Sequence, residues 1–230
     1  MKIPGAIIAA SDCRITGTNI SQETKEDASK DATERNNTTI VNTNNNYIST
    51  DQEQKTFLLI NRYNKSFSIS YCGNASIGGY PTSFCISNAL KLLNDVKSTY
   101  EIIEYFKFLW KGINNRPNIL VSGYNSNTAS IVELSSNGVD VKNHFIQDHV
   151  FGITYHGEVD IAKSLIDNMK LEYNLFRLND AISFCEFLIS TTAKVQAFQS
   201  IQQTVSSKYD LLVITENKSK WIVQNSNQLI

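Results

Sequence analysis

The chain has 230 residues, of which 41% are hydrophobic and 19% charged, and its formal net charge is -1. These values are typical of an ordinary globular protein, and the near-zero charge does not indicate a nucleic-acid partner. The apolar runs are too short for a signal peptide or a membrane span, so we expect a cytoplasmic protein without a membrane partner.

Cysteines and histidines would reveal a disulfide framework or a metal site. The cysteines are Cys13, Cys72, Cys85 and Cys185, and the histidines are His144, His149 and His156. The cysteines are scattered without a CxxC pair, which is typical of buried thiols in a reducing compartment. Because the histidines do not cluster with them, we expect no metal ion. We expect no other cofactor either.

The first predicted element is a short buried strand near the N-terminus. Residues 6–10 form an apolar run that is long enough for one strand and too short for most helices. Asp12 and Arg14 follow where this strand leaves the core. Asp and Arg are rarely buried without a partner, so the two are either a structural ion pair or part of a site.

The composition changes from about residue 18 to residue 54, where Asn, Thr, Ser and charged residues dominate. This segment has too few large apolar residues to offset the entropy cost of ordering it. We expect a disordered, Asn-rich surface insertion, the first place where proteases cut, within a single domain of residues 1–230. A short edge strand at residues 39–41 is the alternative.

The rest of the chain reads as separate blocks of strands and helices. Strands are predicted at residues 55–60, 66–72, 118–124, 129–134, 138–142, 150–155, 209–215 and 220–223. Helices are predicted at residues 82–95, 100–113, about 158–169 and 180–199. Asn179 is the expected N-cap of the last helix, and a glycine-rich loop spans residues 73–79. Segregated blocks of this kind predict an α+β domain with antiparallel hairpins.

The segment from Gly5 to Thr16, with Asp12 and Arg14 two residues apart, resembles a motif of proteasome-type β subunits and their bacterial relatives. These proteins are N-terminal nucleophile (Ntn) hydrolases, which cleave peptide bonds with a threonine at the start of the chain. The order of elements also resembles their four-layer αββα sandwich, two antiparallel sheets flanked by helix pairs. The resemblance covers nearly the whole chain apart from the insertion.

The resemblance implies that Asp12 and Lys55 are the catalytic pair. Asp12 falls on the catalytic Asp of the family, and Lys55 on the Lys that makes the threonine hydroxyl easier to deprotonate. Taken by itself, Lys55 is better interpreted as a solvated lysine at a strand edge, and the catalytic interpretation depends on its place after Asp12 in the order of the motifs.

The resemblance also implies four residues that bind substrate. Arg14 and Thr16 fall on the Arg and the substrate-strand Thr of the motif, and Gly73 on the glycine whose N–H helps hold the oxyanion. His156 lies where the family often has a serine near the α-amine. It is either a polar substitute or an exposed histidine in a turn.

Two further departures from the family pattern bear on activity. The strand that carries the threonine is absent from residues 1–230, and Val195 stands where the family has an Asp on the long helix. Cys13 cannot replace the threonine, because this chemistry uses the amine of the nucleophile's own residue as the base. We therefore expect no hydrolysis by the chain as written.

Three functions remain open. The first is a threonine-type peptidase whose true chain begins upstream of Met1. The second is a non-catalytic proteasome-like assembly subunit, and the third is an unrelated α+β binding domain. For the first two we expect like subunits in a homo-oligomer or ring as partners, since residues 106–110 hold more apolar surface than one helix face buries. A peptide is the expected substrate if the protein is active.

Overall fold

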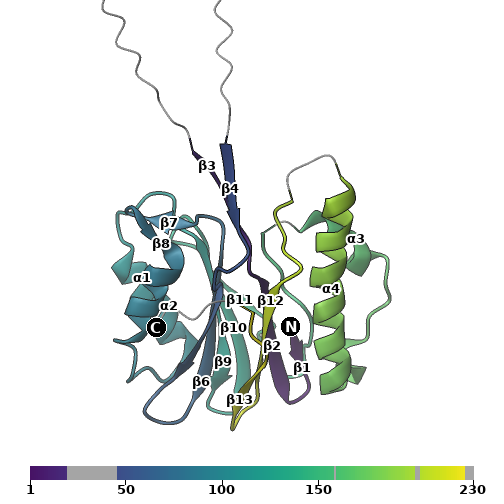
Figure 1. Cartoon of the computed structure of the whole chain (residues 1–230). Coiled ribbons are helices and arrows are strands. Elements are labelled where there is room, and N and C mark those ends of the chain that lie inside the picture. Colours follow the sequence, from purple (N-terminus) through teal and green to yellow (C-terminus); the bar gives the residue numbers. More distant parts are fainter. Residues whose placement is uncertain (20–45, 158, 200–202, 226–230) are drawn as a thin grey trace, which may run out of the picture.

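The computed structural model describes residues 1–19, 46–157, 159–199 and 203–225 (Figure 1). Within these ranges the protein is a mixed α+β structure in which all strand pairs are antiparallel, as the sequence predicted. None of the helices in these ranges has both the length and the apolar character needed to cross a membrane.

The first large sheet joins the two ends of the chain. Its order is β1-β2-β12-β13, with bounds Lys2–Ile3, Ala6–Asp12, Tyr209–Ile214 and Ser219–Val223. Gly5 takes a positive φ of 74° in the tight turn between β1 and β2. The expected N-terminal strand and C-terminal hairpin are both present, and they pair with each other through β2 and β12.

The second large sheet has five strands in the order β11-β10-β9-β6-β5. Their bounds are Val141–His144, Thr128–Leu134, Asn118–Asn125, Ser66–Cys72 and Thr56–Ile60. The predicted meander of β9, β10 and β11 is confirmed. Two short ribbons complete the strands: β3 (Ile15–Asn19) with β4 (Asn46–Thr50), and β7 (Ser76–Ile77) with β8 (Tyr80–Pro81).

The helices form in the predicted order; the first three are shorter than predicted, and the last begins two residues earlier and ends one residue earlier. They are α1 (Thr82–Leu90), α2 (Thr99–Leu109), α3 (Asp160–Asp167), the 3₁₀ turn η1 (Tyr173–Leu175) and α4 (Leu178–Phe198). Asn179 is not the N-cap of α4, because the helix begins one residue earlier. The carboxylate of Asp180 accepts the Arg177 N–H (3.1 Å) and caps this end instead.

Three buried clusters show how the elements pack. One lies between the five-stranded sheet and α1 and α2, and a second between the four-stranded sheet and α4. The third lies between the two sheets, where Ile7, Leu212 and Ile214 meet Tyr124 and Ile131. The sheets therefore pack face to face, and the helices cover their outer faces (Figure 1).

The predicted strand at residues 150–155 does not form. Gly152 makes an isolated bridge to Lys2, and the rest of this segment is extended without a ladder. A strand needs a partner along its length, and the partner here, β1, begins at Lys2.

The predicted disordered insertion is partly wrong. Residues 46–50 pair with residues 15–19, and Glu53 donates its N–H to the Cys13 carbonyl (3.0 Å). The rest of the prediction, including the alternative strand at 39–41, concerns residues 20–45, which lie outside the described ranges.

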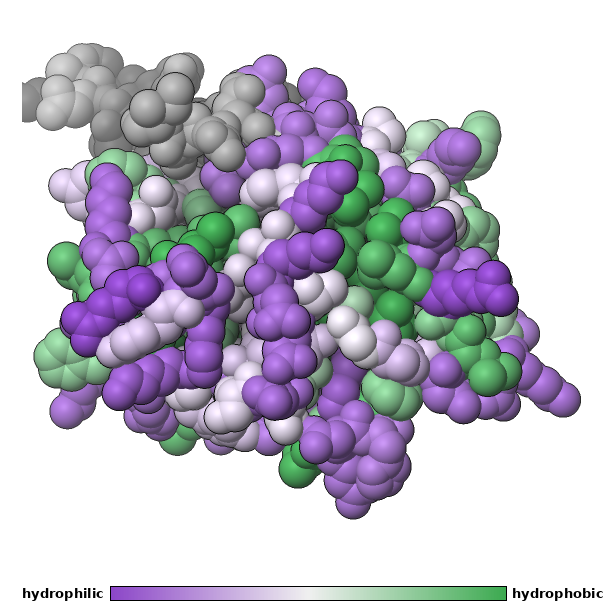
Figure 2. All heavy atoms as spheres, turned by 90° about the horizontal axis from the view of Figure 1, so that it is seen from below, coloured by the Kyte–Doolittle hydropathy of each residue, from purple (hydrophilic) through white to green (hydrophobic). Residues whose placement is uncertain are grey.

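Some large apolar side chains reach the surface of the helix layers. Phe106 and Trp110 are buried against the five-stranded sheet, whereas Phe108 is 77% exposed on the outer face of α2. Figure 2 views the molecule from below, where hydrophobic areas are separated by hydrophilic residues. An exposed apolar side chain is by itself ordinary, so its meaning depends on the residues beside it.

Candidate functional site

A cavity of about 390 Å³ lies beside β2. One wall is the second half of β2, from Ala9 to Asp12, and another is the extended segment of residues 153–157. Leu188 and Thr192 of α4 line a further side. Five of the six residues that the sequence analysis selected line this cavity: Asp12, Arg14, Lys55, Gly73 and His156.

The cavity lies in line with β1, beyond Met1. Met1 exchanges backbone hydrogen bonds with Ile8 (2.8 and 2.9 Å), and Lys2 does the same with Gly152 on its other side (2.8 and 3.0 Å). β1 thus lies between β2 and the segment that begins at Gly152. Beyond Met1 both neighbours continue while the described chain offers no strand between them. We call this space, between residues 9–12 and 153–157, the strand slot.

Among the described residues, no backbone group beyond Met1 hydrogen-bonds to β2 from the side of the strand slot. In an antiparallel ladder, alternate residues direct their N–H and C=O to the same side. Ile8 points toward Met1, so Ala10 and Asp12 point toward the strand slot, while Ala9 and Ser11 point toward β12. A peptide strand in the slot would pair with Ala10 and Asp12.

The ion pair expected between Asp12 and Lys55 is present at the end of the strand slot. Lys55 Nζ lies 3.2 and 3.1 Å from the two carboxylate oxygens of Asp12. The backbone N–H groups of Arg14 (2.9 Å) and Ser206 (3.4 Å) also donate to Asp12 Oδ1. The two side chains are only 18% and 16% exposed, so Lys55 is not a solvated lysine at a strand edge.

Arg14 forms a second ion pair at the rim of the cavity. Its guanidinium makes two hydrogen bonds to the Asp51 carboxylate (2.5 and 2.7 Å), and it donates to the Gln203 carbonyl (3.2 Å). The Arg14 hydrogen bond lowers the pKa of Asp51. Arg14 and Asp51 come directly before and after the two strands of the β3–β4 ribbon, so their ion pair joins the ribbon at its base. Thr16 lies on that ribbon with its backbone paired to Ser49; its side chain is outside the described part.

We expect Asp51→Asn to remove a stabilising ion pair and to weaken the pH dependence of stability. A carboxylate whose pKa is lowered on folding stabilises the protein above its ordinary pKa of 3.8, and this contribution is lost as the pH falls through the folded value. In the wild type this ion pair should add about 1 kcal/mol to the free energy of unfolding at pH 7, and this contribution should disappear in acid. Asp51→Asn should lack the contribution at both pH values. Urea unfolding at pH 7 and pH 3 measures both, and equal pH dependence of the two proteins would contradict the assignment.

Gly73 lies near the Asp12–Lys55 ion pair because β5 and β6 are paired. Tyr71 donates its N–H to the Lys55 carbonyl (3.1 Å), and Gly73 follows two residues later with φ of 94°. This backbone conformation favours glycine, although the space around it would accept a Cβ. Gly73 lines the cavity, and its role toward a substrate stays a prediction.

Cys13 is buried and does not line the cavity, so it offers no substitute nucleophile there. Burial first, and then the charges of Asp210 and Asp12, raise the pKa of the Cys13 thiol to about 12. A thiol with this pKa is protonated at neutral pH and unreactive. Val195 is not part of the cavity lining, whereas Thr192, one turn earlier on α4, is.

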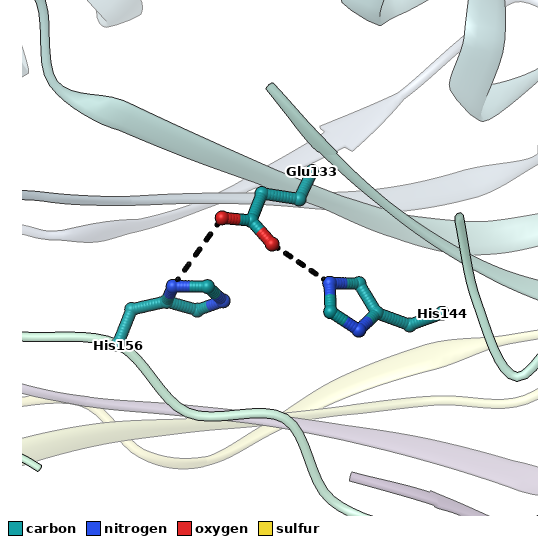
Figure 3. Close-up of side chains that lie close together, drawn as sticks. All are labelled: Glu133, His144 and His156. Carbon is teal, nitrogen blue, oxygen red and sulfur yellow. Dashed lines mark hydrogen bonds and ion pairs between the residues drawn. The ribbon is translucent and has the colours of Figure 1, made fainter. Parts of the chain in front are cut away.

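His156 is not an exposed turn histidine, because its side chain is 24% exposed and faces Glu133. Figure 3 shows the Glu133 carboxylate between two imidazoles, those of His144 and His156. Burial lowers the pKa of His156; Glu133 opposes this effect, and His144 and Lys142 reinforce it. The sequence analysis missed Glu133 and His144. The sequence did contain one sign of Glu133. It is a charged residue on the same strand face as Ala129 and Ile131, which pack between the two sheets.

A search of protein-family models and of curated proteins finds no match to this sequence.

Proposed function

We propose that this protein is a proteasome-like member of the Ntn-hydrolase class, a threonine-type peptidase fold whose nucleophile belongs in the strand slot. The observation that carries the proposal is the Asp12–Lys55 ion pair at the end of the slot. Residues 1–230 supply the charged pair and the walls of the site. They do not supply a threonine that combines a hydroxyl with its own α-amine, so they are inactive by themselves.

The fold supports this proposal through its layers. Helices α1 and α2, the two sheets, and α3 with α4 follow one another across the molecule (Figure 1). We infer that this is the four-layer αββα sandwich of the proteasome-type subunits. The element order along the chain agrees with that inference.

The register of β1 against β2 gives the number of added residues that would fill the strand slot. Lys2 pairs with Ile7 and Met1 with Ile8, so each step back along β1 is one step forward along β2. The fourth residue ahead of Met1 would stand opposite Asp12. Five added residues, beginning with threonine, span about 17 Å at roughly 3.3 Å per residue and bring the first residue past Asp12.

The chemistry follows from that position. The α-amine of the threonine takes the proton from its own hydroxyl, whose oxygen then bonds to the peptide carbonyl carbon. The peptide C–N bond breaks, and the leaving amine takes the proton from the α-ammonium. Water then hydrolyses the resulting ester, which releases the acyl product and restores the threonine. The charge of Lys55, held by Asp12, favours the deprotonated hydroxyl. The backbone N–H at Gly73 is the proposed donor to the oxyanion. The test is peptide hydrolysis by the chain with this five-residue extension, compared with residues 1–230.

A non-catalytic assembly role is the second candidate, favoured by apolar side chains on the α1–α2 layer. Tyr80 and Phe84 stack with a centroid distance of 6.0 Å and are 62% and 45% exposed, and Phe108 is 77% exposed. Like subunits that pack on this layer would cover these rings.

We expect residues 1–230 to form an oligomer at micromolar concentration and Phe108→Glu to shift it toward monomer. A charge placed in an apolar interface costs free energy on association, because it is desolvated without a partner. Phe198→Glu is the matched control, since Phe198 is 91% exposed on the opposite helix layer. Size-exclusion chromatography with light scattering measures both variants. A monomeric wild type would contradict the assembly role.

A further inference from the structure

Three potential metal ligands converge beside the strand slot (Figure 3). Glu133 lies on β10, His144 on β11 and His156 on the segment that walls the slot. His144 Nε2 lies 2.8 Å from Glu133 Oε2, and His156 Nδ1 lies 3.5 Å from Glu133 Oε1. We propose that Glu133, His144 and His156 bind a divalent transition-metal ion, for which Zn²⁺ is the first candidate.

The distances are close to those that a bound ion requires. Zinc binds imidazole nitrogen and carboxylate oxygen at about 2.0–2.2 Å, so ligand atoms around it lie roughly 3.3–3.6 Å apart. The three ligand atoms here all lie within 4.8 Å of one another. The ligand atoms therefore need to move by less than about 2 Å, through changes in side-chain rotamers, to surround an ion.

The surroundings of the three side chains favour a cation. The exposed fractions are 9% for His144, 14% for Glu133 and 24% for His156, so the carboxylate is largely withdrawn from water. Among the described residues, the ion-pair partners of Glu133 are these two imidazoles. Lys142 stands opposite Glu133 on β11, but it is exposed to solvent. With both rings neutral, the cluster carries one negative charge for the ion to balance.

The second ring nitrogen of His156 has a partner that fixes the ring. Its Nε2 lies 3.3 Å from the Thr154 hydroxyl, and this contact directs Nδ1 toward Glu133. Such outer partners orient ligating histidines in metal sites generally. Glu133, Thr154 and His156 all line the 390 Å³ cavity, so a fourth coordination position would open into it. An open position is the mark of a site that also holds water or a small ligand.

The test is a titration of residues 1–230 with Zn²⁺ after removal of metal by a chelator. We expect one equivalent to bind and to raise the melting temperature, because an ion that binds only the folded state stabilises it. His156→Ala should weaken binding at least about 10-fold, since it removes a ligand. His149→Ala, which changes the exposed third histidine, should bind as the wild type does. Equal Zn²⁺ affinity of the wild type and His156→Ala would overturn the proposal.

Thiols also bind zinc, and Cys72 lines the same cavity. Co²⁺ separates the two possibilities, because thiolate ligation adds a charge-transfer band that nitrogen and oxygen ligands do not give. We expect a Co²⁺ spectrum without that band, and unchanged binding in Cys72→Ser. Binding that is lost in Cys72→Ser would assign the ion to the thiol. No stoichiometric binding would leave the three side chains as a structural hydrogen-bonded cluster and overturn the proposal.

His156→Ala is the deciding variant in preference to His144→Ala, because the His156 side chain is the most exposed of the three and lies outside the sheets. The metal proposal is independent of the peptidase proposal. Zinc binding by residues 1–230 is measured without any extension of the chain, so each can fail alone.

Discussion

Residues 1–230 are expected to show no peptide hydrolysis, and an extension of five residues that begins with threonine is expected to create it. The extension follows the register of β1 and fills the strand slot, which brings its α-amine and hydroxyl to the Asp12–Lys55 pair. Lys55→Ala in the extended chain should lower the turnover of a fluorogenic peptide by at least about 100-fold, because it removes the charge that favours the deprotonated hydroxyl.

Two controls make this experiment specific. The same extension with alanine in place of threonine should be inactive, since it lacks the hydroxyl. Lys220→Ala, which changes an exposed lysine on β13, should leave turnover within about twofold. A folded extended chain without activity would refute the peptidase proposal. Turnover by residues 1–230 that survives Lys55→Ala would show that the site lies elsewhere.

The largest expected effect on stability comes from Gly123, at the centre of the five-stranded sheet. Gly123 pairs with Phe67, and a Cβ at this position would lie 2.4 Å from Phe67 Cδ1 and 3.0 Å from the Ser66 carbonyl. Phe67 is fully buried, so its ring cannot move aside without disturbing the core. Gly123→Ala should cost about 2 kcal/mol in the free energy of unfolding, a fall of roughly 4–8 °C in melting temperature.

A double-mutant cycle tests the cause. Phe67→Leu removes part of the ring that meets the new Cβ, so the cost of Gly123→Ala should be at least about 1 kcal/mol smaller in that background. Urea unfolding of the four proteins gives the coupling energy. Costs that simply add would show that the clash does not determine the role of Gly123.

The sequence predicted the elements whose pattern is local. The alternation of polar and apolar residues at 66–72 indicated a strand, and β6 spans these residues. Asp12 and Lys55 were selected because short stretches around them resemble motifs of a known family. The predicted strand at residues 150–155 was wrong because local sequence indicates an extended conformation, whereas a hydrogen-bonded ladder also requires a neighbouring strand. Only the fold shows that β1, its neighbour, begins at Lys2.

Contacts between distant residues were the other limit. Asp51 lies 37 residues from Arg14 in a segment whose composition indicated disorder, yet the two form a bidentate ion pair at the end of that segment. His144 was missed because the predicted strand ended at Lys142, two residues before it. Its meeting with Glu133 and His156 depends on the register of a hairpin and on a separate loop, and neither is encoded in spacing along the chain.

The central claim is that β2 has a free edge, beside Asp12 and Lys55, that accepts a peptide strand. Residue-resolved amide hydrogen exchange tests it most directly. In residues 1–230 the amides of Ala10 and Asp12 should exchange faster than those of Ala9 and Ser11, which face β12. The five-residue extension should slow Ala10 and Asp12 at least about 10-fold and leave Ala9 and Ser11 unchanged. Equal protection of all four amides before the extension, or no change after it, would contradict the strand slot.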